Sequence, residues 1–92
     1  MTTLERAIET YGKDMQLNVA VEELSELIKE ICKNKRGKDN LHNIIEELAD
    51  CYIMMSQIEI IFDIKPIQIS EWIDEKLARL EEGIAERSEN AT

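Results

Sequence analysis

The wide spacing of helix-breaking residues constrains the fold of this chain more than any other feature. Its 92 residues contain three glycines and one proline, at Gly12, Gly37, Pro66 and Gly83. Long uninterrupted segments between such residues predict long helices. Only four residues are aromatic, which leaves little material for a β-sheet. We therefore expect an all-α fold, and we exclude Rossmann-type and P-loop enzymes, which need glycine-rich phosphate loops.

The breakers divide the chain into four expected helices, at about 3–11, 14–34, 40–62 and from 66 onward. Apolar residues recur at three- and four-residue spacing within these segments, as in amphipathic helices. A basic turn at 34–38 separates the second helix from the third, so these two should fold back as an antiparallel hairpin. The polar tail at about 86–92 should fray.

The length fits one domain, residues 1–92. A chain this short buries only part of its apolar surface, and the third expected helix is apolar on nearly all sides. We therefore expect a four-helix, bundle-like fold that is completed by oligomerisation into a homodimer or homotetramer.

The charge balance is strongly acidic, with 20 acids, 11 bases and a net charge of −9. This argues against unassisted binding to a nucleic acid polymer or to an anionic membrane. Binding of a phosphorylated small molecule is compatible with this net charge if metal ions neutralise the charge at the binding site. No apolar run is long enough to span a membrane, and the N-terminus does not resemble a signal peptide. With Cys32 and Cys51 interpreted as reduced thiols, we expect a cytoplasmic protein.

An acidic motif occurs twice in the chain. Residues 21–27 (VEELSEL) match residues 45–51 (IEELADC) at an offset of 24. Each copy reads apolar, acid, acid, leucine, small, acid. The second and third acids of each copy are three residues apart, so they lie on one face of a helix.

The turn places the two copies opposite each other. In sequence, the midpoint between Glu26 and Glu47 is position 36.5, and the midpoint between Glu23 and Asp50 is the same position. This position lies inside the basic turn. In an antiparallel hairpin the members of each pair lie level, so four carboxylates converge and repel. Either some are protonated or cations hold them together. Oxygen ligands without nearby Cys or His favour a hard ion, Mg²⁺ first and Mn²⁺ second.

A solvated acidic face is the simpler alternative, because glutamates at helical spacing usually face water. Asp50 argues against it, since it stands in the largely apolar segment 48–62. No Lys or Arg occurs between Lys38 and Lys65 to pair with it. Burying a carboxylate without a partner is costly, so a metal ion is the economical explanation.

These residues resemble a family. The pattern of Glu22, Glu23 and Glu26, followed after 20 residues by Glu47 and Asp50, looks like the EExxE…ExxD signature of the MazG-like all-α nucleoside triphosphate pyrophosphohydrolases. The stretch 11–16 (YGKDMQ) and residues 35–37 look like the short single-domain branch of this family.

The resemblance implies Mg²⁺-dependent hydrolysis of a nucleoside triphosphate between its α- and β-phosphates. By the same resemblance, Glu23, Glu26, Glu47 and Asp50 would bind the metal. Glu22 would orient or deprotonate the attacking water. The family forms dimers or tetramers in which neighbouring subunits help to build the nucleotide pocket.

Substrate contacts are expected from four further residues. Lys38 belongs to the basic cluster at the turn, which is equally compatible with a solvated helix end. Lys76 and Arg79 look like the basic residues that the family places after its second acidic motif, although Glu82 and Gly83 interrupt the fuller pattern. Gln16 is a candidate for contact with the base.

Two other hypotheses stay open beside the enzyme. One is a non-catalytic helical interaction module whose acidic face meets a basic partner. The other is a metal-stabilised regulator that keeps the fold without turnover. Asp50 argues against the first, because a simple interaction face needs no charge in an apolar segment. The sequence does not separate the enzyme from the regulator.

Overall fold

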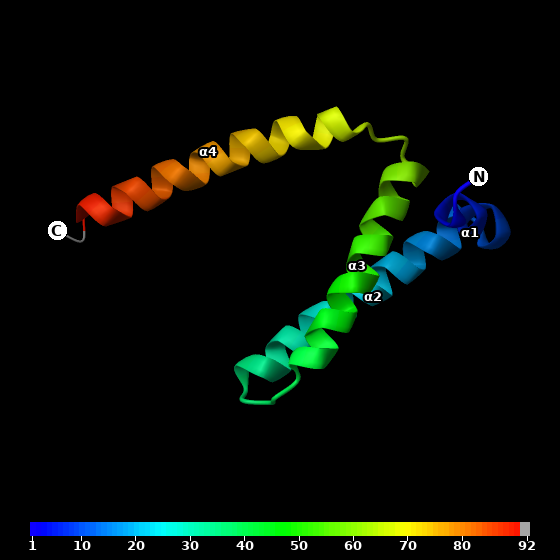
Figure 1. Ribbon diagram of the computed structural model, residues 1–92, viewed down its shortest axis with the longest axis horizontal. Helices are drawn as coiled ribbons and strands as arrows, with labels where there is room; N and C mark the ends of the chain where they lie inside the picture. The colour runs from blue at the N-terminus through cyan, green and yellow to red at the C-terminus, as the bar shows by residue number, and fades with distance from the viewer. Residues whose placement is uncertain (91–92) are drawn as a thin grey trace.

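A computed structural model describes residues 1–90 of the chain, which form four α-helices and no strand (Figure 1). The all-α prediction is confirmed, and apart from the end of the fourth helix, the helices begin and end within about two residues of the expected positions. The helices are α1 (Thr3–Tyr11), α2 (Lys13–Lys35), α3 (Leu41–Ile61) and α4 (Pro66–Asn90).

Short-range hydrogen bonds define the start and the end of α1. The backbone N–H of Glu5 donates to Thr2 Oγ1 at 3.2 Å, and the N–H of Thr2 donates to Glu5 Oε1 at 3.1 Å. This reciprocal capping box satisfies two N–H groups that a helix N-terminus leaves free. Gly12 then adopts a φ of 91°, a conformation that L side chains disfavour, and separates α1 from α2.

A buried polar cluster closes the turn between α2 and α3. Asn40 is only 4% exposed, and its Nδ2 donates to the carbonyl O of Glu30 at 2.9 Å and to Glu30 Oε2 at 2.7 Å. Asn34 Nδ2 donates to Asn40 Oδ1 at 3.3 Å. Gly37 has a φ of 98°, so the backbone reverses there without a side chain. The turn thus fixes α2 and α3 as the expected antiparallel hairpin.

The two hairpin helices pack along one row of residues on each, which we call the contact line. Its members recur at three- and four-residue spacing and are the least exposed positions of both helices. Apolar burial along it is limited, because Ala20, Cys51 and Met54 are the only buried apolar residues among those described. The contact line comprises Gln16, Ala20, Glu23, Leu27 and Glu30 on α2, and Asn40, Ile44, Glu47, Cys51, Met54 and Gln57 on and just before α3.

The fourth helix does not join the others. Helices α1, α2 and α3 contact one another, whereas α4 contacts none of them and buries no residue (Figure 1). The radius of gyration is 17.5 Å, whereas a compact chain of this length would have about 12 Å. Within one chain, the expected four-helix arrangement is therefore three packed helices and one that extends away.

The end of the chain is more ordered than its composition suggests. Residues 86–90, expected to fray, continue α4 as far as Asn90. The remainder of the expected frayed tail, 91–92, lies outside the described residues. Among residues 1–90, no helix combines the length and the apolar character needed to cross a bilayer.

Candidate metal centre

Three of the four expected carboxylate ligands meet at the middle of the hairpin. Glu23 comes from α2, and Glu47 and Asp50 come from successive turns of α3. Each offers one oxygen, and these oxygens all lie within 4.8 Å of one another. The three side chains are half-buried. The cluster arises because Glu23 and Glu47 occupy the contact line and Asp50 directly precedes Cys51 on it.

Glu26, the fourth expected ligand, lies at the edge of this cluster. Its Oε1 lies 3.7 Å from Lys29 Nζ on the next turn of α2. Its charge nevertheless contributes to raising the pKa of Glu47, so it lies close to the centre. Because the pair with Lys29 is largely exposed, it costs little to break.

The cluster carries mutually repelling charges in a partly desolvated place. Burial, followed by a hydrogen bond and charge repulsion from Asp50, raises the pKa of Glu23. Burial, and then repulsion from Asp50 and Glu26, raises the pKa of Glu47. Burial and the same carboxylates raise the pKa of Cys51, so its thiol stays protonated. The raised pKa values of Glu23 and Glu47 both reflect the free-energy cost of ionising acids that are partly buried and lie close together without a positive charge nearby.

The environment of these carboxylates suits a hard cation. Glu47 Oε2 is buried and has no hydrogen-bond partner among the described residues. None of the ion pairs found within residues 1–90 involves Glu23, Glu47 or Asp50. Oxygen ligands with no compensating base are what Mg²⁺ and Mn²⁺ bind. On these grounds the residues fit the expected metal.

The further acids of the repeated motif lie beside the cluster. Glu22 and Glu46 are exposed and each precedes a cluster member in sequence. Ser25 Oγ donates to the backbone carbonyl O of Glu22 at 2.7 Å, so this bond does not involve the Glu22 carboxylate. Glu46 adds to the repulsion that raises the pKa of Glu47.

The expected substrate residues are spread over the molecule. Gln16 is 7% exposed and lies on the contact line, two turns before Glu23. Lys38 is exposed beside the hairpin turn. Lys76 and Arg79 lie on α4, so one chain does not bring them to the carboxylates. Lys76 Nζ lies 5.7 Å from the centroid of the Trp72 ring, and Arg79 Nη2 lies 2.6 Å from Glu75 Oε1.

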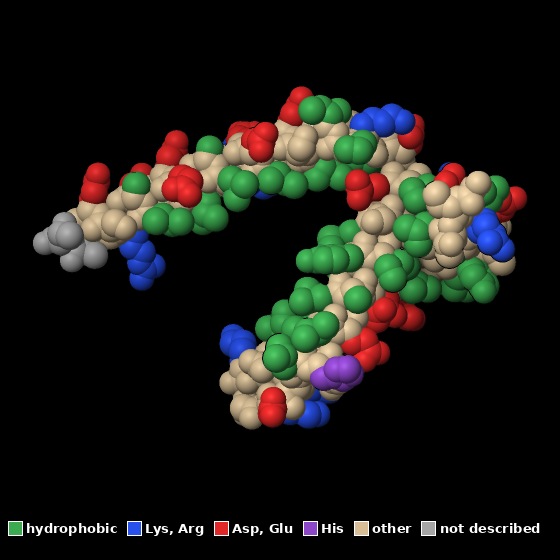
Figure 2. Space-filling view, in the orientation of Figure 1, with side chains coloured by type: hydrophobic (Ala, Val, Ile, Leu, Met, Phe, Trp, Pro, Cys, Tyr) green, Lys and Arg blue, Asp and Glu red, His purple; other side chains and the backbone are tan. Residues whose placement is uncertain are grey.

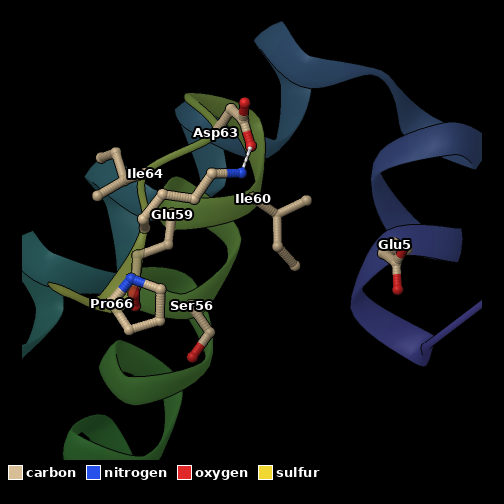
Figure 3. A pocket seen from close by; sticks show the side chains of 8 residues that line it. Glu5, Ser56, Glu59, Ile60, Asp63, Ile64 and Pro66 are labelled. Atoms are coloured by element: carbon tan, nitrogen blue, oxygen red, sulfur yellow. Dashed lines mark hydrogen bonds and ion pairs between the residues drawn. The ribbon is translucent and has the colours of Figure 1, made fainter. Parts of the chain in front are cut away.

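A hollow of about 490 Å³ lies elsewhere, between α1 and the turn that leads from α3 to α4 (Figure 3). Glu5 lines it from α1, and Ile60 and Pro66 line it from the other side. Lys65 Nζ and Asp63 Oδ1 form an ion pair at 2.8 Å at its rim. None of the carboxylates of the repeated motif lines this hollow, so it is separate from the candidate metal centre.

Two buried polar features were not anticipated from the sequence. Gln57 is 2% exposed, and its Oε1 is buried without a hydrogen-bond partner. The second is the Glu30–Asn40 pair at the turn. The register that pairs Glu23 with Asp50 also pairs Gln16 with Gln57. The same counting from the turn could therefore have placed Gln57 opposite α2.

Comparison of the chain with protein-family models, with curated proteins and with solved structures found no match.

Proposed function

We propose that this protein is a Mg²⁺-dependent nucleoside triphosphate pyrophosphohydrolase, which releases a nucleoside monophosphate and pyrophosphate. The observation that carries the proposal is the group of Glu23, Glu47 and Asp50, with oxygens within 4.8 Å of one another and no compensating base. The resemblance to the MazG-like family adds the reaction class.

Each acid has a distinct part in this proposal. Glu23, Glu47 and Asp50 would hold the cation, with Glu26 joining them when its exposed pair with Lys29 opens. A bound Mg²⁺ supplies charge neutralisation for the phosphates and acidifies a bound water. Mg²⁺ sites commonly combine a few carboxylates with substrate phosphates, which suits a protein of net charge −9. Glu22, whose carboxylate is exposed, orients the attacking water or accepts its proton.

The proposal includes a homo-oligomer, either a dimer or a tetramer. The chain exposes 7463 Å², whereas a compact monomer of its mass would expose about 5,500 Å². Lys76 and Arg79 belong to the substrate site only if α4 reaches the carboxylates of another chain or moves onto its own. Gln16 and Lys38 complete the proposed substrate contacts, on the base and the phosphates respectively.

The decisive experiment incubates the protein with Mg²⁺ and a panel of canonical and damaged nucleoside triphosphates. Pyrophosphate and nucleoside monophosphate are expected in equal amounts. Release of inorganic phosphate and a nucleoside diphosphate would instead contradict cleavage between the α- and β-phosphates. Glu9→Gln is the matched control for the site variants, because Glu9 is an exposed acid on α1.

A non-catalytic interaction or regulatory module is the second candidate. The extent of exposed apolar surface on α2, α3 and α4 favours it, because such surface marks sites of protein association. A regulator of this kind would still be stabilised by Mg²⁺, yet it would release no pyrophosphate from any nucleotide in the panel.

A further inference from the structure

Gln57 is a buried polar residue whose burial the packing of the hairpin does not explain. It lies on the contact line of α3, only 2% of its surface is exposed, and its Oε1 is buried without a hydrogen-bond partner among the described residues. An unpaired amide in such a place costs free energy, which an apolar residue of similar size would avoid. Gln57 is therefore a candidate for contact with a ligand that donates a hydrogen bond.

Gln57 lies at the open end of the hairpin, level with Gln16 of α2, which is also buried. Gln57 follows Asp50 by seven positions on α3, and Gln16 precedes Glu23 by seven positions on α2. Both amides therefore lie about 10 Å along the hairpin from the candidate metal centre. A nucleotide has its phosphates at one end and its base at the other, so a single extended molecule can reach from the carboxylates to the amides.

One side of the hairpin changes from acidic to apolar over this distance. It consists of the residues that directly precede the contact line, because the helices are antiparallel and one step back in sequence leads to the same side on both. Figure 2 shows acidic side chains along one edge of the hairpin and hydrophobic side chains beyond them, toward α1. From the turn toward α1, this side comprises Lys29, Glu26, Glu22, Val19 and Met15 on α2, and Asn43, Glu46, Asp50, Ile53 and Ser56 on α3.

The hollow beside α1 adjoins Gln57. Ser56, which directly precedes Gln57, and Ile60, one turn after it, both line the hollow (Figure 3). Its volume of about 490 Å³ is typical of a pocket for a small molecule. Glu5 of α1 lines the opposite wall, and none of the residues of α1 is buried. A small shift of α1 therefore costs little and opens the hollow toward Gln57.

The groups that line the hollow are mainly hydrogen-bond acceptors. Glu5, Glu59 and Asp63 are acids. Lys65 is the one cation among the lining residues, and its Nζ lies 2.8 Å from Asp63 Oδ1. Such a lining repels phosphate groups and attracts N–H groups. A nucleobase is neutral and carries N–H groups at its edge, so the base suits this end of the molecule better than the triphosphate does.

We infer that Gln57 recognises the base of the nucleotide. Its Oε1 accepts a hydrogen bond from an N–H group of a base that enters the hollow beneath α1, while the triphosphate lies at the carboxylates. The inference rests on the proposed function and goes beyond it, because it makes Gln57 a specificity-determining residue. The substrate class is then the nucleoside triphosphates whose base donates a hydrogen bond.

The test measures binding without catalysis, with Mg²⁺ and α,β-methylene triphosphates of two matched pairs of nucleosides. The pairs are inosine with purine riboside, and cytidine with the riboside of 2-pyrimidinone. Only the first member of each pair has an N–H group on its base. In titration calorimetry, the parent should bind the first member of at least one pair tenfold or more tighter than the second. Gln57→Leu should bind both members with equal affinity, close to the weaker value of the parent.

This substitution should preserve the fold. Gln57→Leu replaces an unpaired buried amide with an apolar side chain of similar size, so without nucleotide its melting temperature should equal or exceed that of the parent. Asn18→Leu is the matched control, because Asn18 is an exposed amide on α2, and it should keep the discrimination. A lower melting temperature of Gln57→Leu with unchanged discrimination would show that Gln57 serves the fold, and it would overturn the inference.

The remaining outcomes separate the inference from the proposed function. Equal affinity of the parent for both members of each pair, together with pyrophosphate release from nucleoside triphosphates, would overturn the inference and leave the activity standing. Discrimination that depends on Gln57, without pyrophosphate release, would support the inference and favour the regulatory module. If the parent binds none of the four analogues, the inference and the proposed function both fail.

Discussion

Glu47 illustrates how a single residue links the fold of this protein to its candidate function. Its position on the contact line brings its carboxylate into the helix–helix interface, where one oxygen is buried without a partner. A residue chosen for stability alone would be apolar there, as Met54 is about two turns further along α3. The cost of the buried acid is explained if the carboxylate binds a cation.

We expect Glu47→Gln and Asp50→Asn to lose pyrophosphate release by more than about 100-fold, the upper range for residues that only support a metal ligand. Both substitutions keep the shape of the side chain and remove a ligand charge. Without metal, both variants should melt at the same temperature as the parent or higher, because repulsion in the cluster falls.

Pyrophosphate assays and circular dichroism, with Glu9→Gln as the control, check this expectation. Loss of helicity in both variants would show that the carboxylates serve the fold instead.

The Glu30–Asn40 pair predicts a pH dependence at the hairpin turn. The hydrogen bond from Asn40, and then the charge of Lys33, lower the pKa of Glu30 in the folded chain. A lowered folded-state pKa means that ionised Glu30 stabilises the fold above its unfolded pKa. This stabilisation is lost as the pH falls below about 4.5, the ordinary value.

The comparison of the parent with Glu30→Gln measures this effect, because other acids titrate equally in both proteins. The parent should be the more stable at pH 7, and the difference in melting temperature should vanish as the pH falls through the acid range. A difference that stays constant with pH would show that the charge of Glu30 is not what stabilises the turn.

At the scale of the helices, α4 differs from the other three because it has no partner within the chain. Its stability in one chain therefore depends on helix propensity and on local pairs, such as Arg79 with Glu75. Gly83 weakens it near its C-terminal end, since glycine loses the most conformational freedom in a helix. Apart from its two chain neighbours and the adjacent backbone of α4, no heavy atom lies within 4 Å of the position that a Cβ would take at Gly83.

Gly83→Ala should therefore stabilise α4 locally by up to about 1 kcal/mol. Amide hydrogen exchange should show slower exchange around residue 83 and no change at the hairpin turn. Faster exchange, or a weaker oligomer by light scattering, would indicate that another chain approaches Gly83 too closely to admit a methyl group.

The whole molecule combines a thin core with a concentration of negative charge. Within residues 1–90, three apolar residues are buried, and the net charge of the chain is −9. Such a chain should respond strongly to any ligand that neutralises the acidic cluster.

Mg²⁺ or Mn²⁺ should raise the melting temperature. The expected stabilisation is about 2.7 kcal/mol when the free cation stands about 100-fold above its dissociation constant. For a domain of this size, that corresponds to roughly 10 °C or more. Scanning calorimetry with chelator and with millimolar Mg²⁺ measures the shift.

Sodium chloride at matched ionic strength controls for screening of surface charge. Glu47→Gln should lose most of the shift, whereas Glu9→Gln should keep it. Identical melting curves with chelator and with Mg²⁺ would count against the metal centre.

The sequence by itself determined the helices and the convergence of the acids. Helix boundaries follow from local features, namely the Thr2 capping box, the positive φ of Gly12 and the proline at the start of α4. The position of the basic turn sets the hairpin register, and the register brings Glu23 level with Asp50. The register and the level position of these two residues both follow from counting residues along regular helices, so they can be predicted without the tertiary structure.

Only the tertiary structure decided which side chains become buried and where α4 goes. That Glu26 stays outside the group formed by Glu23, Glu47 and Asp50 depends on how the helices are rotated against each other, which helical periodicity leaves open. The direction of α4 depends on a few backbone angles between Phe62 and Pro66, including the positive φ of Asp63. Small changes in those angles move a helix of 25 residues by many ångströms, so the local sequence does not determine its path.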